Sequence, residues 1–229
     1  VAGVPATVTV TEDSASGLDL SAITFTDLDN GATLTVTFTA GAGTLAATDG
    51  TGVTVGGTGT ATLTLTGTVS AINTYLDTSG AIKYTSAANA TGTGVTSIGV
   101  TANDGAGSGD VSLGSMSVNV TGVNDAPVLT PASPTLTGIT EDATTNSGQT
   151  VDSFLTGVTD ADASPVSGIA ISGLASGNGT WQYSVDSGSN WVDVGTVSAS
   201  SALLLKSTDK VRFVPDGKNG TSASMTYHA

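Results

Sequence analysis

Acidic side chains occur in tight groups, although only 10% of the 229 residues are charged. The groups are Glu12-Asp13, Asp27-Leu28-Asp29, Asn103-Asp104, Asn124-Asp125, Glu141-Asp142 and Asp160-Ala161-Asp162. Neighbouring carboxylates repel one another unless a cation lies between them, and Ca²⁺ accepts about 6 to 8 oxygen ligands from carboxylates, amides and carbonyls. Together the groups therefore predict calcium binding. For any single pair, the alternative is that Asp and Asn simply begin a turn.

Other site chemistry finds few suitable residues. The chain has no Cys, and its one His, His228, lies in a strand pattern typical of a surface or edge position. A Ser-His-Asp triad or a His-ligated metal site needs more than this. A phosphate-binding glycine loop lies between a strand and the start of a helix. Glycine clusters such as residues 105–109 do not have this position. We therefore expect no enzymatic activity.

The charge balance limits the partners. The chain has five basic and 19 acidic residues, which gives a net charge of −14. Such a field repels nucleic acid and anionic lipid and attracts cations. The apolar runs are also far shorter than the roughly 20 residues of a membrane-spanning helix. We expect no nucleic-acid binding and no membrane insertion.

Strand patterns dominate the elements that must position these acids. Apolar and polar residues alternate at period two, which predicts strands with one buried face. The clearest examples are residues 6–10, 34–38, 61–66 and 115–120. Thr fills most outward positions, where its β-branch suits a pleated surface, and glycine-rich turns separate the runs. The pattern predicts an all-β fold.

One segment has helical spacing instead. Val69, Ile72, Tyr75 and Leu76 recur at intervals of three and four residues, which predicts a helix of two turns or fewer. Ser70 is placed to cap its start, and glycine at position 80 to end it.

The chain also contains a weak internal repeat. Residues 10–13 (Val-Thr-Glu-Asp) and 26–29 (Thr-Asp-Leu-Asp) return as residues 139–142 (Ile-Thr-Glu-Asp) and 159–162 (Thr-Asp-Ala-Asp). The offset is about one domain length, which indicates two copies of one module. We predict a first domain over 1–123, a linker with calcium-binding character over 124–128, and a second domain over 129–229.

These motifs resemble the cadherin-like repeats of giant bacterial surface adhesins of the repeats-in-toxin type. Residues 124–128 (Asn-Asp-Ala-Pro-Val) match the linker of that family, Glu141-Asp142 its acidic pair, and residues 160–162 its Asp-x-Asp motif. In the second domain, residues 179–186 with Trp191 are similar to a common adhesin subtype. The resemblance implies two tandem immunoglobulin/cadherin-like Greek-key β-sandwich domains, with one short helix in the first.

The same resemblance implies a ligand set for Ca²⁺. At the joint it assigns Glu12, Asp104, Asn124, Asp125, Asp160 and Asp162. It assigns Asp27 and Asp29 to a joint with a preceding domain, and Glu141 to a joint with a following one. The chain departs from the family in having no Asp in residues 92–95 and in stopping at His228-Ala229. We therefore expect the second sandwich to be truncated at its C-terminal end.

Three functions fit these observations. The first is a non-enzymatic extender segment of a secreted adhesin at the extracellular cell surface, whose partners are neighbouring repeats of the same chain. The second is a subunit of a self-assembling sheath, filament or surface layer, in which copies of the chain pair through Thr-rich edge strands. The third is a carbohydrate-binding module using Trp181 or Trp191, although the strand context of both predicts core and edge positions.

Overall fold

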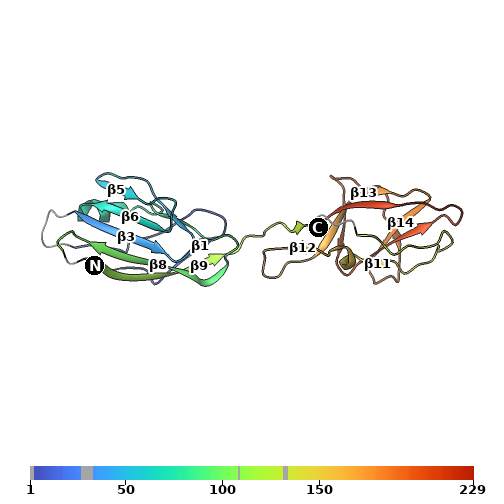
Figure 1. Ribbon diagram of the computed structural model, residues 1–229, viewed down its shortest axis with the longest axis horizontal. Helices are drawn as coiled ribbons and strands as arrows, with labels where there is room; N and C mark the ends of the chain where they lie inside the picture. Colours follow the sequence, from blue (N-terminus) through green and yellow to red (C-terminus); the bar gives the residue numbers. More distant parts are fainter. Residues whose placement is uncertain (1–2, 27–32, 108, 131–133) are drawn as a thin grey trace. The chain divides into compact units, whose positions relative to one another are not determined.

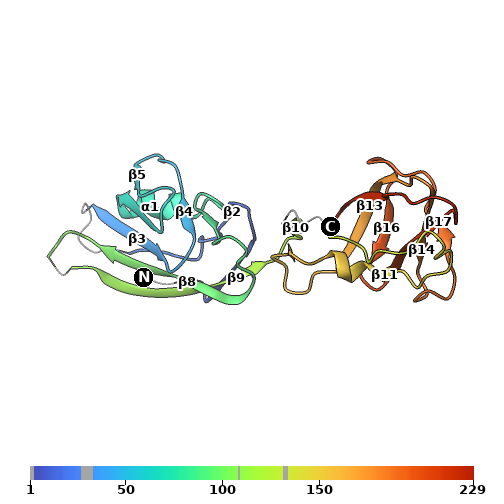
Figure 2. The ribbon, with the colours of Figure 1, turned by 45° about the vertical axis from the view of Figure 1, so that its right-hand side comes forward.

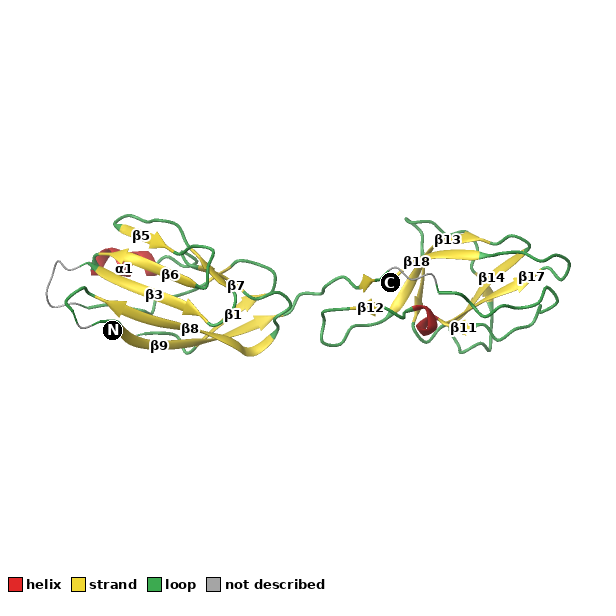
Figure 3. Ribbon diagram, viewed as in Figure 1, coloured by secondary structure: helices red, strands yellow, loops and turns green. Residues whose placement is uncertain are grey.

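A computed structural model describes residues 3–26, 33–107, 109–130 and 134–229. The fold is mostly β, with several sheets and, within these ranges, one α-helix (Figures 1 and 3). This agrees with the predicted all-β class. The chain divides into two compact units, Val1–Asn124 (unit 1) and Asp125–Ala229 (unit 2). The division lies inside the segment 124–128, which the sequence marks as a linker.

Six strands form the larger sheet of unit 1. They are β1 (Thr7–Thr11), β3 (Leu34–Ala40), β5 (Val53–Gly56), β6 (Thr62–Gly67), β8 (Gly92–Asn103) and β9 (Val111–Thr121). Their order is β1-β9-β8-β3-β6-β5. β1 runs parallel to β9, whereas β9–β8, β8–β3, β3–β6 and β6–β5 are antiparallel pairs. The four strand runs expected from alternation all lie in this sheet.

A smaller sheet completes unit 1. It contains β2 (Ser16–Gly17), β4 (Thr44–Ala46) and β7 (Lys83–Thr85) in the order β2-β7-β4. One apolar core holds side chains from both sheets, for example Phe38 and Val100 from the larger and Leu45 and Tyr84 from the smaller. The alternation produces this core directly, because period two sends every second side chain of β3 inward.

The predicted helix is α1 (Val69–Leu76), which lies against β5 and β6 (Figure 2). It buries Ile72 and Leu76, as the helical spacing requires. The expected cap at Ser70 is wrong. Thr68 caps the helix instead, since its Oγ1 accepts a hydrogen bond from the Ala71 backbone N–H at 3.2 Å. Thr68 has the extended backbone of a cap residue, which places its side chain within hydrogen-bond distance of that amide.

Unit 2 has shorter strands in smaller sheets. One sheet contains β11 (Gln149–Thr150), β14 (Gly179–Ser184), β15 (Val192–Asp193) and β17 (Lys210–Pro215) in the order β11-β17-β14-β15. A second contains β13 (Gly168–Ala175), β16 (Leu203–Lys206) and β18 (Ser224–His228) in the order β16-β13-β18. β10 (Val128–Leu129) pairs with β12 (Val158–Thr159), and the 3₁₀-helix η1 covers Val151–Phe154. The core contains Val151, Phe154, Ile169, Ile171, Trp181, Leu205 and Val211.

The two units share a set of strand pairings. In unit 1, β3 lies between β6 and β8, and β7 lies between β2 and β4. In unit 2, β13 lies between β16 and β18, and β17 lies between β11 and β14. The strands occur in the same order along both halves of the chain. Because strand pairing follows from contacts distant in sequence, this likeness supports the repeat independently of the acidic motifs.

Candidate functional site

Among the described residues of unit 1, Glu12 is the most completely buried acid, at 2% exposure. It continues the inward face of β1, because Val8, Val10 and Glu12 are spaced two residues apart. Its backbone N–H donates to the Thr121 carbonyl at 3.0 Å. The next residue, Asp13, has a φ of 53°, a left-handed conformation that Asp accepts more readily than most residues. The chain therefore turns directly after Glu12, and the Glu12 carboxylate lies next to the end of β9.

The two carboxylate oxygens of Glu12 have different surroundings. Oε2 accepts a hydrogen bond from the Val123 backbone N–H at 3.2 Å. Oε1 is buried and has no hydrogen-bond partner among the described residues. An ionised oxygen that is buried without a partner costs free energy. A cation next to Val123, the residue before the linker, would remove that cost.

In unit 2, a pair of aspartates follows β12. Oδ1 of Asp160 accepts from the Asp162 backbone N–H at 2.9 Å, and Oδ2 of Asp162 accepts from the Asp125 backbone N–H at 3.1 Å. The pairing of β10 with β12 places Val128 opposite Thr159, which explains why the linker lies next to these acids. In unit 2 the backbone of Asp125 therefore lies next to Asp162, and the backbone of Asp162 next to Asp160.

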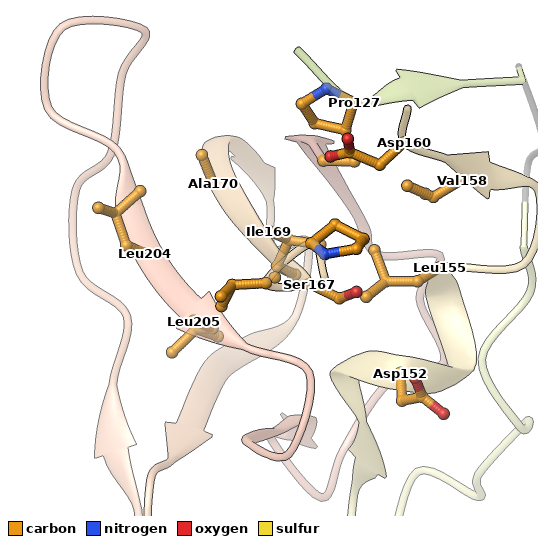
Figure 4. A pocket seen from close by; sticks show the side chains of 14 residues that line it. Pro127, Asp152, Leu155, Val158, Asp160, Ser167, Ile169, Ala170, Leu204 and Leu205 are labelled. Atoms are coloured by element: carbon orange, nitrogen blue, oxygen red, sulfur yellow. The ribbon is translucent and has the colours of Figure 1, made fainter. Parts of the chain in front are cut away.

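Asp160 also lies at a pocket of about 450 Å³ in unit 2 (Figure 4). Its carboxylate lies beside Pro127, whereas Asp152 lies at a different side of the pocket. The rest of the lining is largely apolar and includes Val166, which is 94% exposed, and Leu204, which is 75% exposed. Asp160 thus lies at the end of the pocket that contains the linker residue Pro127.

The structure separates Asp104 from Glu12, although the resemblance assigns both to one joint. β8 pairs with β9 in a register that places Gly92 opposite Val120 and Ala102 opposite Val111. Asp104 follows the Val111 end of this ladder, whereas Glu12 lies at the Thr121 end. Since a strand rises about 3.3 Å per residue, a ladder of this length holds the two carboxylates far apart. Asp104 instead accepts a hydrogen bond from the Ala106 backbone N–H at 2.9 Å.

The remaining predicted ligands have mixed positions. Asn124 is exposed and Asp125 is half-buried, at the boundary between the units. Glu141 is exposed in a turn, unlike its repeat counterpart Glu12. Asp27 and Asp29 lie outside the described residues.

Within the described ranges, three or more His, Cys, Asp or Glu side chains nowhere gather closely enough to hold a metal ion. A calcium ion at the linker would therefore need amide or carbonyl oxygens as additional ligands, which Ca²⁺ accepts.

Two aromatic residues considered for sugar binding are occupied by protein contacts. Trp181 is 2% exposed and packs edge-on against Phe213, with ring centroids 5.3 Å apart. Trp191 carries the Arg212 guanidinium over its ring, 4.1 Å from the centroid. Trp181 is in the core, as the strand pattern predicted. A sugar ring stacks on an exposed aromatic face. Trp181 is buried, and the Arg212 guanidinium covers the ring of Trp191.

A hydrogen-bonded turn around Asp186 was missed by the sequence reasoning. Asp186 Oδ1 accepts from the Asn190 backbone N–H at 2.9 Å and from Ser184 Oγ at 2.7 Å, and Oδ2 accepts from Asn190 Nδ2 at 2.6 Å. These bonds, led by the Asn190 amide, lower the pKa of Asp186 to about 2. The signal in the sequence is Ser184-x-Asp186 followed by Ser-Gly, a typical turn composition.

Acid should weaken unit 2 partly through Asp186. Because its folded pKa lies below its ordinary value of 3.8, Asp186 stabilises the fold above that value and loses this contribution as the pH falls toward about 2. Asp186→Asn should lower the unfolding temperature of unit 2 near neutral pH and flatten its decline in acid. Tryptophan fluorescence measures this, since Trp181 and Trp191, the two tryptophans of the chain, both lie in unit 2. Asp142→Asn, at an exposed turn of the same unit, is the control; identical pH profiles for the chain and Asp186→Asn would contradict the prediction.

Comparison with known proteins gives no family. No protein-family model, no curated protein sequence and no solved structure matches the chain. Among the residues that the structure describes, no helix is long and apolar enough to cross a membrane.

Proposed function

We propose that the chain is a non-enzymatic extender segment of a large secreted surface adhesin, built from tandem immunoglobulin/cadherin-like Greek-key sandwiches whose linker binds Ca²⁺. The observation that supports it most strongly is that an acid of each unit accepts a hydrogen bond from the backbone within the linker or directly before it. Glu12 accepts from Val123, and Asp162 accepts from Asp125. The shared strand pairings of the two units favour a repeated structural module.

Calcium would act on the linker by charge. Without a cation, carboxylates brought close to one another at a linker repel. Bound Ca²⁺ would supply a positive centre for Glu12, Asn124, Asp125, Asp160 and Asp162, of which Glu12 offers an oxygen that is already buried and without a partner among the described residues. Pro127 adds stiffness, because its ring fixes its own φ and favours an extended residue before it. The linker would then be stiff only when calcium is present.

Small-angle scattering tests this proposal directly. We expect the isolated chain to be a monomer with one extended distance distribution in calcium and a broader, more flexible one after chelation. Asp125→Ala should be flexible in both conditions while both units stay folded. Asp104→Ala removes an acid at the other end of the β8–β9 ladder and should behave as the unmodified chain does. If chelation leaves the scattering of the unmodified chain unchanged, calcium does not stiffen the linker.

The assembly subunit remains a second candidate because one sheet of unit 2 ends, among the described residues, in strands with a neighbour on one side. Both β16 and β18 end their three-stranded sheet, and an unprotected edge is a template for association. Ordered polymers formed by the isolated chain would favour this function over the extender. The carbohydrate-binding candidate is disfavoured by the burial of Trp181 and the Arg212 contact of Trp191.

A further inference from the structure

The dipeptide Asn-Gly occurs three times in the chain, at residues 30–31, 178–179 and 219–220. An Asn side chain places an electrophilic amide carbon near the backbone nitrogen of the next residue, and glycine has no Cβ to hinder their approach. The first dipeptide lies outside the described residues. The other two both continue with Thr, as Asn178-Gly179-Thr180 and Asn219-Gly220-Thr221. Unit 2 thus contains one tripeptide in two structural settings.

The first of these tripeptides is held by the fold at the start of β14. The backbone N–H of Asn178 donates to Thr221 Oγ1 at 3.3 Å, and the Asn178 carbonyl accepts from the Asp216 backbone N–H at 3.0 Å. Gly179 is the first residue of β14 and belongs to the ladder with β17. Rotation of the backbone between Asn178 and Gly179 therefore requires that both hydrogen bonds of Asn178 break.

The second tripeptide lies in the loop between β17 and β18, where Asn219 and Gly220 are both exposed. The backbone N–H of Asn219 donates to Asp216 Oδ1 at 3.1 Å. The backbone N–H of Gly220 donates to no other described residue. Apart from its neighbours in the chain, no described atom lies within 4 Å of the point that a Cβ of Gly220 would occupy. A loop with so few contacts rearranges at little cost in free energy.

Unit 1 has a corresponding loop, which is exposed in the same way. β7 and β8 are the counterparts of β17 and β18, and the loop between them contains Asn89-Ala90-Thr91. Asn89 is exposed, although β9 follows β8 in this unit and pairs with it. The backbone N–H of Ala90 donates to the Ala87 carbonyl at 3.2 Å. Asn89 thus resembles Asn219 in position and exposure, but its next residue has a Cβ and a nitrogen that is hydrogen-bonded.

We propose that Asn219 is a site of spontaneous covalent modification, at which the Asn219-Gly220 linkage converts to aspartyl and isoaspartyl forms. The backbone nitrogen of Gly220 loses its proton and attacks Cγ of Asn219. The bond between Cγ and Nδ2 breaks, the side-chain nitrogen leaves as ammonia, and a cyclic succinimide remains. Water then opens this ring at either of its carbonyl carbons and leaves a carboxylate. Water is the only other reactant, and no group is oxidised or reduced.

The conversion changes both the charge and the backbone of this loop. A carboxylate at position 219 adds a negative charge near Asp216, in a chain whose net charge is already −14. In the isoaspartyl form, the backbone passes through the former side chain and is one carbon longer. The open surroundings of Gly220 accommodate both products without displacement of other residues. The modification goes beyond the proposed extender function, which does not require it.

Incubation of the whole chain at mildly alkaline pH, followed by peptide mass spectrometry, tests the proposal. Cleavage after Lys218 releases residues 219–229, in which Asn219 has the only side-chain amide. We expect Asn219 to convert roughly tenfold faster than Asn178, because two hydrogen bonds must break before Asn178 can react. Asn89 should also convert more slowly than Asn219. The rate at Asn219 should rise with pH, since the nucleophile is a deprotonated nitrogen. A sample digested without incubation corrects for conversion during digestion.

Denaturant separates the effect of the fold from that of the sequence. In the unfolded chain, Asn178 and Asn219 should convert at similar rates, because each precedes Gly-Thr. Gly220→Ala adds a Cβ beside the attacking nitrogen at a position with room for it, so the variant should fold and convert several-fold more slowly. Asn219→Asp supplies the reference for the charge of the aspartyl product.

Four results would each overturn the proposal. They are absence of conversion at Asn219, equal rates at Asn178 and Asn219 in the folded chain, an undiminished difference between them in denaturant, and an unchanged rate in Gly220→Ala. Because the incubation contains no calcium, failure here is distinguishable from failure of the extender proposal.

Discussion

Chelation of calcium should lower the unfolding temperature of unit 1, because the ion would compensate the buried carboxylate of Glu12. One oxygen of this side chain is buried without a hydrogen-bond partner among the described residues, so its negative charge lacks compensation once the ion leaves. Binding to the folded state alone stabilises it by RT ln(1 + [L]/Kd), about 3 kcal/mol when free calcium is 100-fold above Kd. Calorimetry with and without chelator measures this shift.

Two Glu→Gln variants separate binding at Glu12 from a general charge effect. Glu12→Gln keeps an oxygen that can accept from the Val123 backbone N–H but removes the charge, so most of the calcium-dependent shift should disappear. Glu141→Gln makes the same change at the repeat counterpart, which is exposed in a turn, and should retain the shift. An unmodified chain that unfolds at one temperature with and without chelator would contradict calcium binding, and equal shifts in both variants would exclude Glu12 as a ligand.

The two units should unfold in separate transitions, with unit 2 unfolding first. Hydrophobic stabilisation scales with the apolar area removed from water, and unit 2 buries fewer apolar side chains than unit 1. The calorimetric trace should therefore contain two peaks. Tryptophan fluorescence should follow only the lower one, since both tryptophans lie in unit 2. One peak coincident with the fluorescence change would show that the two units unfold together.

A core substitution in unit 1 assigns the upper transition. Phe38 is 0% exposed in the centre of β3, so Phe38→Ala should cost about 3–5 kcal/mol through lost transfer free energy and the cavity left behind. The upper peak should fall by roughly 10 °C or more, and the fluorescence transition should stay in place. Thr39→Ala, at the next and exposed position of β3, should change the upper peak little. A shift of the fluorescence transition in Phe38→Ala would show that the units are not independent.

Elements whose signal is local were predictable from the sequence. The alternation at residues 34–38 predicted β3 because period two is a property of the strand itself, and the spacing of Ile72 and Leu76 predicted α1 because helical contacts join residues three and four apart. The repeat of residues 10–13 at 139–142 likewise needed no structure. The acids near the linker were found in the same way, since their grouping is visible in a chain with few charges.

The tertiary structure decided what depends on partners distant in sequence. Only the register of β8 against β9 shows that Asp104 and Glu12 lie at opposite ends of a ladder, because the sequence gives their types but not the direction in which the chain carries them. Similarly, residues 7–11 and 136–140 occupy equivalent positions in the repeat, yet only the first segment is a strand. A strand needs hydrogen bonds from a neighbour. The sequence by itself determined the strand pattern and its acids, while contacts distant in sequence determined that Glu12 is buried and that its repeat counterpart Glu141 is exposed.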